Sequence, residues 1–415
     1  MVNVRRPHRP QIHATMRESE TVTPLELFFD LVFVLALTQC TAFIAADPSW
    51  EGLAKAVLIL GILWWAWVGY AWLTSVIDPE EGAVRIIFFV AMAAFLVAAI
   101  CVPEAFDDLG LTIAVAYGVV RVCHILLFVI ASENDPELRK SVVGLAISTA
   151  IGVALLATAA ALDGVAQGAL WAVALLLDAG GPYFFGSGGW KLQPEHFAER
   201  HGLILIIALG ESIVAIGAGV QYGVTAGVIA AAVIGVGIAA AQWWAYFDLS
   251  AIASSRRLAS ITDQRERNEL ARDSYSYIHF FMVAGIVLVA LGLKKTIGYT
   301  DEPLKEVPAF ALFGGAAIYL LGLVAFRWRH IHSFAHRRFV AAVICLAMIP
   351  VALEIPALAS VGILFVILWV MVVADLRVYG DRRNQLRHGE VRAPGEGGGP
   401  AEDVQPMPGG STSST

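Results

Sequence analysis

The feature of this sequence that most restricts its fold is a series of long apolar stretches. Stretches of roughly 17 to 25 residues recur along the chain, and this length matches the hydrocarbon thickness of a bilayer. A helix of a soluble domain has a polar face, whereas these stretches have none over long runs. Only 15% of the 415 residues are charged, against about 25% in an average soluble domain. The sequence therefore predicts an all-α integral membrane protein.

The stretches predict about twelve transmembrane helices in two sets. The first set is expected at 26–46, 53–77, 84–102, 109–131, 141–161 and 166–185, and the second at 200–220, 224–247, 275–293, 307–326, 338–353 and 357–379. Short motifs recur in the same order in both sets: Trp-Trp-Ala-Trp begins at Trp64, and Trp-Trp-Ala-Tyr begins at Trp243. We therefore predict two parallel six-helix repeats, with chance similarity among apolar helices as the alternative.

The two ends of the chain differ in composition from its apolar middle. The tail is rich in Gly, Pro, Ser and Thr, which is typical of disorder, and the N-terminal segment is polar, without the apolar stretch of a cleaved signal peptide. We expect a disordered cytoplasmic N-terminus over 1–23 and a disordered cytoplasmic tail over 386–415. Between them we expect the first repeat over 24–190 and the second over 191–385.

Basic residues are distributed unevenly between the predicted connections. Arginines crowd the N-terminal segment, the even-numbered connections and the C-terminal side, whereas the odd-numbered connections contain only Lys55, Lys294, Lys295 and Lys305. Cytoplasmic loops of membrane proteins carry an excess of Lys and Arg. Both termini are therefore predicted to be cytoplasmic, and this asymmetry agrees with an even number of spans.

Several classes of function find no support in the sequence. It contains neither a basic stripe with interleaved aromatic residues nor a P-loop motif. The four cysteines lie in apolar stretches without paired spacing, as packing residues do. His196, Glu199 and His201 could bind a metal, but the two histidines are about 140° apart around a helix. We expect no metal, no cofactor and no nucleic-acid partner.

The first predicted helix carries two carboxylates near its cytoplasmic end. Glu26 and Asp30 are four residues apart, which places both on one face of the helix. Like charges at this spacing repel, so either cations neutralise them or one carboxylate takes up a proton. The alternative is that they only complement the dipole at a helix N-terminus. Further along the same helix, Thr38 and Gln39 add hydrogen-bonding groups.

The seventh predicted helix carries the clearest signal of function. An acid–base cluster of Glu199, Arg200 and His201 lies at its cytoplasmic boundary. Glu211, followed by Ser212, lies about 15 Å deeper, near the middle of the bilayer. Ionisable side chains at such depth are costly and usually have a function.

The fourth predicted helix contains the deepest cation of the sequence. Arg121 lies in its middle, with His124 one turn away on the same face. Depth alone motivates the hypothesis that Arg121 pairs with Glu211. The alternative is a buried ion pair that only fixes the register of the helices.

Further carboxylates lie near the predicted cytoplasmic ends of several helices. Asp248 follows Trp243 and Trp244 at the end of the eighth helix. The others are Asp78, Glu80, Glu81, Asp178 and Asp375. They could surround a cation vestibule, or they could pair with the arginines of the loops.

Four motifs of the chain resemble those of a known family, the bacterial low-temperature-requirement A proteins. They are Glu-Leu-Phe-Phe-Asp-Leu-Val-Phe-Val at 26–34, His-Phe-Ala-Glu-Arg-His-Gly at 196–202, Ile-Ala-Leu-Gly-Glu-Ser-Ile at 207–213, and the stretch from Trp243 to Asp248. The likeness covers about residues 20 to 380 of this chain. The resemblance implies a bacterial multi-pass protein of the cytoplasmic membrane that is linked to growth in the cold. It implies no established reaction or substrate.

We expect a secondary transporter or an ion-conducting protein, with a polar path between its two halves. Its partners would be the lipid bilayer and a small solute or ion, with proton coupling through Glu211 as the concrete version. The residues expected along the path are Glu26, Asp30, Gln39, Arg121, His124, Glu199, Arg200, His201, Glu211, Ser212, Trp244 and Asp248.

Two alternatives remain open. One is a membrane-embedded enzyme that acts on a lipid or an isoprenoid carrier, using the cytoplasmic acid–base cluster. The other is a role in assembly or sensing, in which the polar residues only join helices. A cavity lined by Glu211 would favour transport, a lateral opening at the cytoplasmic cluster would favour lipid chemistry, and dry packing would favour a structural role.

Overall fold

The computed structural model describes residues 21–80, 82, 84–184, 189–220 and 223–387, with side chains up to residue 378. These residues form helices joined by turns. The predicted disordered ends, 1–23 and 386–415, lie almost entirely outside the described residues.

The first half of the chain contains six long helices. They are α1 (Pro24–Ala46), α2 (Trp50–Thr74), α3 (Val84–Ile100), α4 (Gly110–Ala131), α5 (Pro136–Ala159) and α6 (Gly164–Phe184). A short 3₁₀ turn, η1 (Val102–Glu104), precedes α4. Each helix coincides with one predicted span.

The second half contains six long helices and several shorter elements. They are α7 (Pro194–Gly219), α8 (Ala226–Phe247), α9 (Ser250–Ser260), α10 (Gln264–Ala271), the π-helical turn η2 (Arg272–Ile278), α11 (His279–Gly298), α12 (Glu306–Ala309), the π-helical turn η3 (Phe310–Gly314), α13 (Gly315–Ile331), α14 (His336–Ala352) and α15 (Ala357–Arg387). Helices α9 and α10 occupy a predicted connection, where their polar sequences gave no apolar stretch.

Ten helical segments of the described chain are long and apolar enough to cross a membrane. The two remaining helices at predicted spans, α3 and α14, are shorter, with 17 residues each. Helix α14 carries Arg337 and Arg338 in its first turn and contains Pro350, which limits its apolar length. The prediction of a helical multi-pass membrane protein is confirmed, whereas the six-helix repeat stays a prediction.

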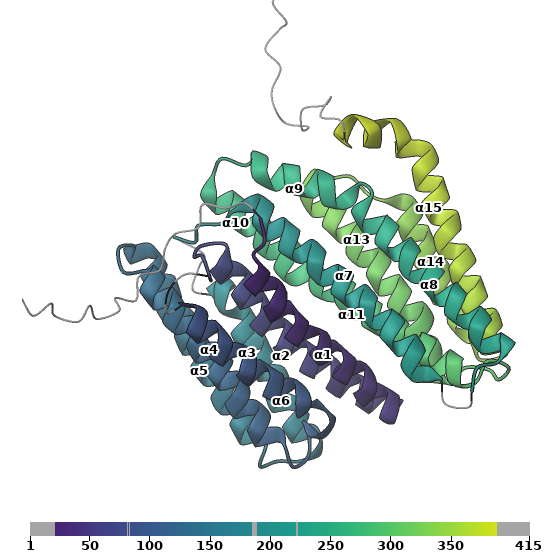
Figure 1. Ribbon diagram of the computed structural model, residues 1–415, viewed down its shortest axis with the longest axis horizontal. Helices are drawn as coiled ribbons and strands as arrows, with labels where there is room; N and C mark the ends of the chain where they lie inside the picture. Colours follow the sequence, from purple (N-terminus) through teal and green to yellow (C-terminus); the bar gives the residue numbers. More distant parts are fainter. Residues whose placement is uncertain (1–20, 81, 83, 185–188, 221–222, 388–415) are drawn as a thin grey trace, which may run out of the picture.

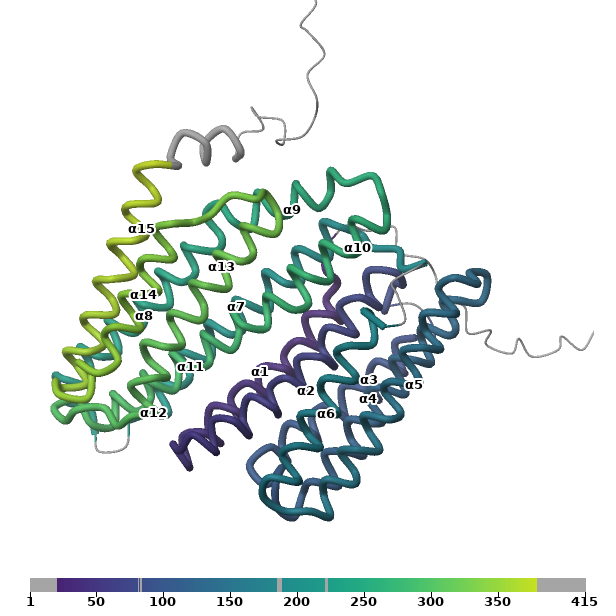
Figure 2. Tube along the Cα trace, turned by 180° about the vertical axis from the view of Figure 1, so that it is seen from behind, coloured from purple at the N-terminus to yellow at the C-terminus, as the bar shows by residue number. Residues whose placement is uncertain are grey.

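The two halves of the chain lie beside each other (Figures 1 and 2). Helices α1 to α6 form one group, and α7 to α15 form the other. Between the groups, α1 packs against α7 and α11, and α2 also contacts these two helices. We call this contact the seam. We call the end of the bundle at which α9 lies and at which α1 and α7 begin the α9 end (Figure 1).

Helix α1 begins with a reciprocal cap that also orients a residue of the site. The Thr23 hydroxyl accepts the Glu26 N–H at 3.4 Å, and Glu26 Oε2 accepts the Thr23 N–H at 2.8 Å. Pro24 follows at the first helical position, where its missing N–H has no cost. The cap fixes one carboxylate oxygen of Glu26 and leaves the other, Oε1, for partners across the seam.

Helices α11 and α13 approach each other more closely than any side chain would allow. A Cβ atom added at Gly285 would lie 2.6 Å from the carbonyl oxygen of Gly315, and one at Gly315 would lie 2.8 Å from that of Gly285. Small residues at such crossings let two helix backbones meet inside a membrane protein. The two backbones are therefore in direct contact.

Candidate functional site

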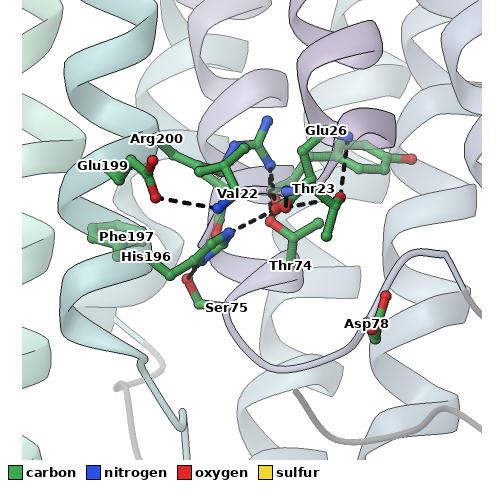
Figure 3. Close-up of polar contacts among 12 residues, drawn as sticks. Val22, Thr23, Glu26, Thr74, Ser75, Asp78, His196, Phe197, Glu199 and Arg200 are labelled. Atoms are coloured by element: carbon green, nitrogen blue, oxygen red, sulfur yellow. Dashed lines mark hydrogen bonds and ion pairs between the residues drawn. The ribbon is translucent and has the colours of Figure 1, made fainter. Parts of the chain in front are cut away.

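The two carboxylates of α1 are completely buried at the seam. Glu26 and Asp30 are each 0% exposed. Their partners come from the second half of the chain and from α2, as Figure 3 shows around Glu26. Buried charges need compensation, because desolvating an unpaired ion costs several kcal/mol.

Arg200 of α7 compensates both carboxylates. Its Nη2 lies 2.6 Å from Asp30 Oδ1, and its Nη1 lies 3.4 Å from Glu26 Oε1. The same Nη1 donates to the Thr74 hydroxyl at 2.8 Å. The guanidinium also lies over the Trp67 ring, 5.5 Å from its centre. A cation thus lies between the two carboxylates, as one of the two expected outcomes requires, but a single guanidinium balances only one of their two charges.

His196 and Trp67 complete the cluster. His196 Nε2 lies 2.8 Å from Glu26 Oε1, and its Nδ1 lies 3.3 Å from the Ser75 hydroxyl, which itself donates to the Ala71 carbonyl. Trp67 donates its indole N–H to Asp30 Oδ1 at 2.7 Å. We call Glu26, Asp30, Thr74, His196 and Arg200 the seam cluster.

The edge of the seam cluster reaches the surface at the α9 end. Glu199, next to Arg200, is exposed and accepts the Val22 N–H at 3.1 Å (Figure 3). The backbone that precedes α1 is thereby tied to α7. Successive residues of α7 thus divide their roles, since Glu199 faces outward and Arg200 faces the seam.

Glu211 lies farther along the same seam. It is 1% exposed, and its Oε2 accepts a hydrogen bond from the Thr38 hydroxyl of α1 at 2.5 Å. It lies about 26 Å along α7 from Pro194 and about 12 Å from Gly219. Glu211 is therefore nearer to the end of the bundle opposite α9 than to the α9 end.

The predicted pairing of Glu211 with Arg121 is wrong. Arg121 Nη2 lies 2.8 Å from Asp178 Oδ1 of α6, and both side chains are 1% exposed. Tyr117 and Thr149 also donate to this carboxylate. The reason is the packing of the helices, because α4 packs against helices of the first half, whereas α7 meets α1, α2, α8 and α11. We call this contact the Arg121–Asp178 pair.

The remaining predicted residues are dispersed. His124 contacts Arg121 and the Gly69 carbonyl, and His201 is buried among aromatic rings, with its Nδ1 on the Phe197 carbonyl at 2.8 Å. The other predicted residues lie outside the seam cluster. Gln39 on α1, Trp244 on α8 and Asp248 directly after α8 are half-buried, and Ser212 on α7 is buried.

Sequence reasoning missed several members of these networks. The sequence suggested His196 only as a possible metal ligand and not as a partner of Glu26. Thr74 and Trp67 carried no signal, because nothing in the sequence shows that α2 faces α7. Asp178 was predicted to lie near the cytoplasmic end of its helix, either in a cation vestibule or paired with a loop arginine. The pair could have been found from the sequence, because Asp178 is a carboxylate within an apolar helix of the same half as Arg121.

Two hollows lie near the seam, one at each end. At the end opposite α9, a cavity of about 250 Å³ lies between α1 and α11, lined by Ala42, Lys294 and Lys295 among others. At the α9 end, a groove of about 410 Å³ runs between α7, α8 and α9, beside Glu195 and Glu199.

The cluster predicted as a metal candidate does not assemble as one. Glu199 faces the surface, whereas His196 and His201 contact different partners inside the bundle. Within the described ranges, no three His, Cys, Asp or Glu side chains are placed to hold a metal ion.

Comparisons with known proteins agree with the motifs in α1 and α7. The profile of the family described as "Bacterial low temperature requirement A protein (LtrA)" matches residues 21–373. An uncharacterized protein of Rhizobium meliloti (strain 1021) is 30% identical over 311 residues, which cover 72% of this chain and 75% of that protein. No solved structure matches this chain. The chain belongs to the bacterial low temperature requirement A family.

Proposed function

We propose that this protein is a proton-coupled secondary transporter whose path follows the seam. One observation carries the proposal: buried ionisable side chains lie along the seam at two separate levels, and at the first of these levels both halves contribute them. The seam cluster lies at the α9 end, which we take as the cytoplasmic side, and Glu211 lies with Thr38 farther along. Such residues inside a membrane protein generally belong to a path for ions or protons.

The seam cluster has the groups needed to exchange a proton. Its two carboxylates face one guanidinium and one imidazole, so an imidazolium form of His196 would balance the charges. Ser75 favours that form, since its hydroxyl donates to Ala71 and can then accept from Nδ1. Among the described atoms, Asp30 Oδ2 is buried without a hydrogen-bond partner, which leaves it as a place for an added proton.

The two levels are separated by an apolar layer. From Asp30 to Thr38 the distance along α1 is about 12 Å, and the residues between them include the buried Phe33, Ala36 and Leu37. An open pore would have water across this layer. Glu211 is buried and lines neither of the two hollows, so the proposed transporter requires a second conformation in which the seam opens to one side at a time.

Proton flux into vesicles tests the proposal. The full chain would be reconstituted with a pH-sensitive dye inside, and an acid pulse applied under a potassium–valinomycin clamp. We expect vesicles with the wild type to acidify faster than empty ones, and Glu211→Gln to slow this flux by about tenfold or more, because a glutamine cannot carry a proton. Glu51→Gln is the control, because Glu51 is an exposed carboxylate in the first turn of α2, and this variant should keep the wild-type rate.

Two results would refute proton coupling. One is a wild-type rate equal to that of empty vesicles. The other is a Glu211→Gln variant with the wild-type rate at every pH.

A second candidate function draws support from the groove beside Glu195 and Glu199. This groove is a lateral opening at the predicted cytoplasmic cluster, the feature expected of an enzyme acting on a lipid. Incubation of the reconstituted protein with labelled phospholipid and isoprenoid phosphate tests it. A new labelled product that disappears in Glu199→Gln would favour the enzyme over the transporter.

A further inference from the structure

The groove at the α9 end combines apolar walls with a charged rim. Its walls include Gly202 and Ile206 of α7 and Phe247 at the end of α8. Glu195 and Glu199, one turn apart on α7, and Arg256 of α9 line its polar part. An apolar hollow with a few polar groups at one end is the usual form of a site for an amphipathic ligand.

The orientation of the groove matches the direction of a lipid. From Glu195 to Ile206 it follows α7 for about 16 Å. Ile206 is 45% exposed on the outer surface of α7, and Ile213 and Val214 farther along the helix are exposed as well. The polar end of the groove therefore lies at the end of the helix, and its apolar end opens onto the surface that faces the acyl chains.

We propose that this groove binds a phospholipid whose headgroup ends in a primary ammonium. The ammonium lies against Glu195 and Glu199, and the phosphate lies against Arg256. The beginning of one acyl chain runs past Gly202 towards Ile206. This site is distinct from the proposed proton path, because most of its lining residues on α7 lie on a different face of the helix from Arg200.

The charges of the rim decide the class of lipid. Two carboxylates and one guanidinium complement a headgroup that carries one ammonium and one phosphate. An anionic headgroup without an amine would face two like charges. A quaternary ammonium has no N–H to donate to the carboxylates, so a choline headgroup lacks the hydrogen bonds that a primary ammonium makes.

Native mass spectrometry of the full chain tests the proposal. The protein would be offered an equimolar mixture of phosphatidylethanolamine, phosphatidylcholine and phosphatidylglycerol with the same acyl chains. We expect the wild type to retain phosphatidylethanolamine about fivefold or more above the other two. Glu195→Gln should bring the three lipids close to parity.

Two matched controls separate the site from general effects. Glu137→Gln removes an exposed carboxylate that also follows a proline in the first turn of its helix, and it should keep the preference. Gly202→Leu fills the groove, where an added Cβ would lie 3.3 Å from the Phe247 ring, and it should lower retention of all three lipids. At Gly210 on the same helix, an added Cβ would meet no neighbour within 4 Å, so the Gly210→Leu variant should retain all three lipids as the wild type does.

Each remaining outcome overturns the proposal. Equal retention of the three lipids by the wild type would show that no headgroup is recognised. Stronger retention of phosphatidylglycerol would show that the site prefers anions. An undiminished preference in a monodisperse Glu195→Gln variant would place the recognition elsewhere.

Discussion

The two buried arginine networks of this protein differ in where they lie and in how completely they are paired. The Arg121–Asp178 pair lies inside the first half, and its single carboxylate receives Tyr117, Thr149 and one guanidinium. Arg200 lies between the halves and is shared by two carboxylates that also contact a histidine. The first arrangement matches one guanidinium with one carboxylate, whereas in the second one guanidinium faces two carboxylates, and our proposal assigns a change of proton count to that second network. Burial of an arginine by itself therefore does not identify a functional site.

The largest effect that we predict is on stability, from breaking the Arg121–Asp178 pair. Asp178→Asn leaves the guanidinium buried without a counter-charge and should lower the free energy of unfolding by about 3–5 kcal/mol. Unfolding in mixed micelles with increasing SDS measures it. The double variant Arg121→Met/Asp178→Leu removes both charges and should recover most of the loss. A single variant within about 1 kcal/mol of the wild type would contradict a structural role for the pair.

At the seam we predict that a conservative substitution affects flux more than stability. Arg200→Lys keeps the charge, but one ammonium cannot reproduce the planar fork that reaches Glu26, Asp30 and Thr74. Proton flux should fall by about tenfold, with a loss of about 1–3 kcal/mol in stability, less than at Asp178. Arg337→Lys, on a half-exposed arginine of α14, is the control. Unchanged flux in Arg200→Lys would mean that the seam cluster, like the Arg121–Asp178 pair, only holds helices together.

A smaller effect is expected at the second level of the seam. Thr38→Val keeps the shape of the side chain but removes the hydrogen bond to Glu211. We expect flux to change by about three- to tenfold, which corresponds to roughly 1 kcal/mol in the interaction. Thr158 is a matched control, because its hydroxyl also bonds to the carbonyl four residues earlier but lies exposed on α5. Equal effects of Thr38→Val and Thr158→Val would remove Thr38 from the path.

The smallest effect is expected for a pair in contact with water. Asp135 caps α5 through the Leu138 N–H at 3.1 Å and lies 3.3 Å from Lys191. The Leu138 N–H, followed by Lys191, holds the pKa of this carboxyl below its ordinary value. Its contribution is therefore present above the unfolded pKa and is lost as the pH falls through the folded pKa. Asp135→Ala should cost about 1 kcal/mol at pH 7.

The pH dependence distinguishes this cap from the buried pairs. The difference in unfolding midpoint between the wild type and Asp135→Ala should shrink as the pH falls below about 4, where the unfolded carboxyl is protonated. Asn134→Ala, at the neighbouring loop position, serves as the control. A difference that stays constant down to acid pH would mean that the carboxylate form does not matter there.

The helices of this protein were predictable because the hydropathy of a span is set by its own residues and does not require knowing its neighbours. Each predicted span coincides with a helix, and the spacing of Glu26 and Asp30 placed both on one face. The partners of these residues were not predictable, because a lipid-facing apolar position and a helix-facing one have the same hydropathy. Nothing in the sequence of α2 shows that Trp67 and Thr74 face Arg200.

The mistaken pairing of Arg121 with Glu211 has a related cause. The pairing was predicted from depth in the bilayer alone. Depth gives the position along the membrane normal, but not the position within the plane of the membrane. The two residues lie on α4 and α7, which pack against different helices. Asp178 lies close to Arg121 within the plane of the membrane as well, because both residues belong to helices of the same half.

The crossing of Gly285 and Gly315 limits how this protein can change its shape. At Gly285 and Gly315 the backbones of α11 and α13 touch without a side chain between them, and the side chains of Leu288 and Tyr319 lie directly beside this contact. We therefore expect α13 to move together with α11, so that a rearrangement exposing Glu211 or Arg200 pivots on the side of α11 that faces α1.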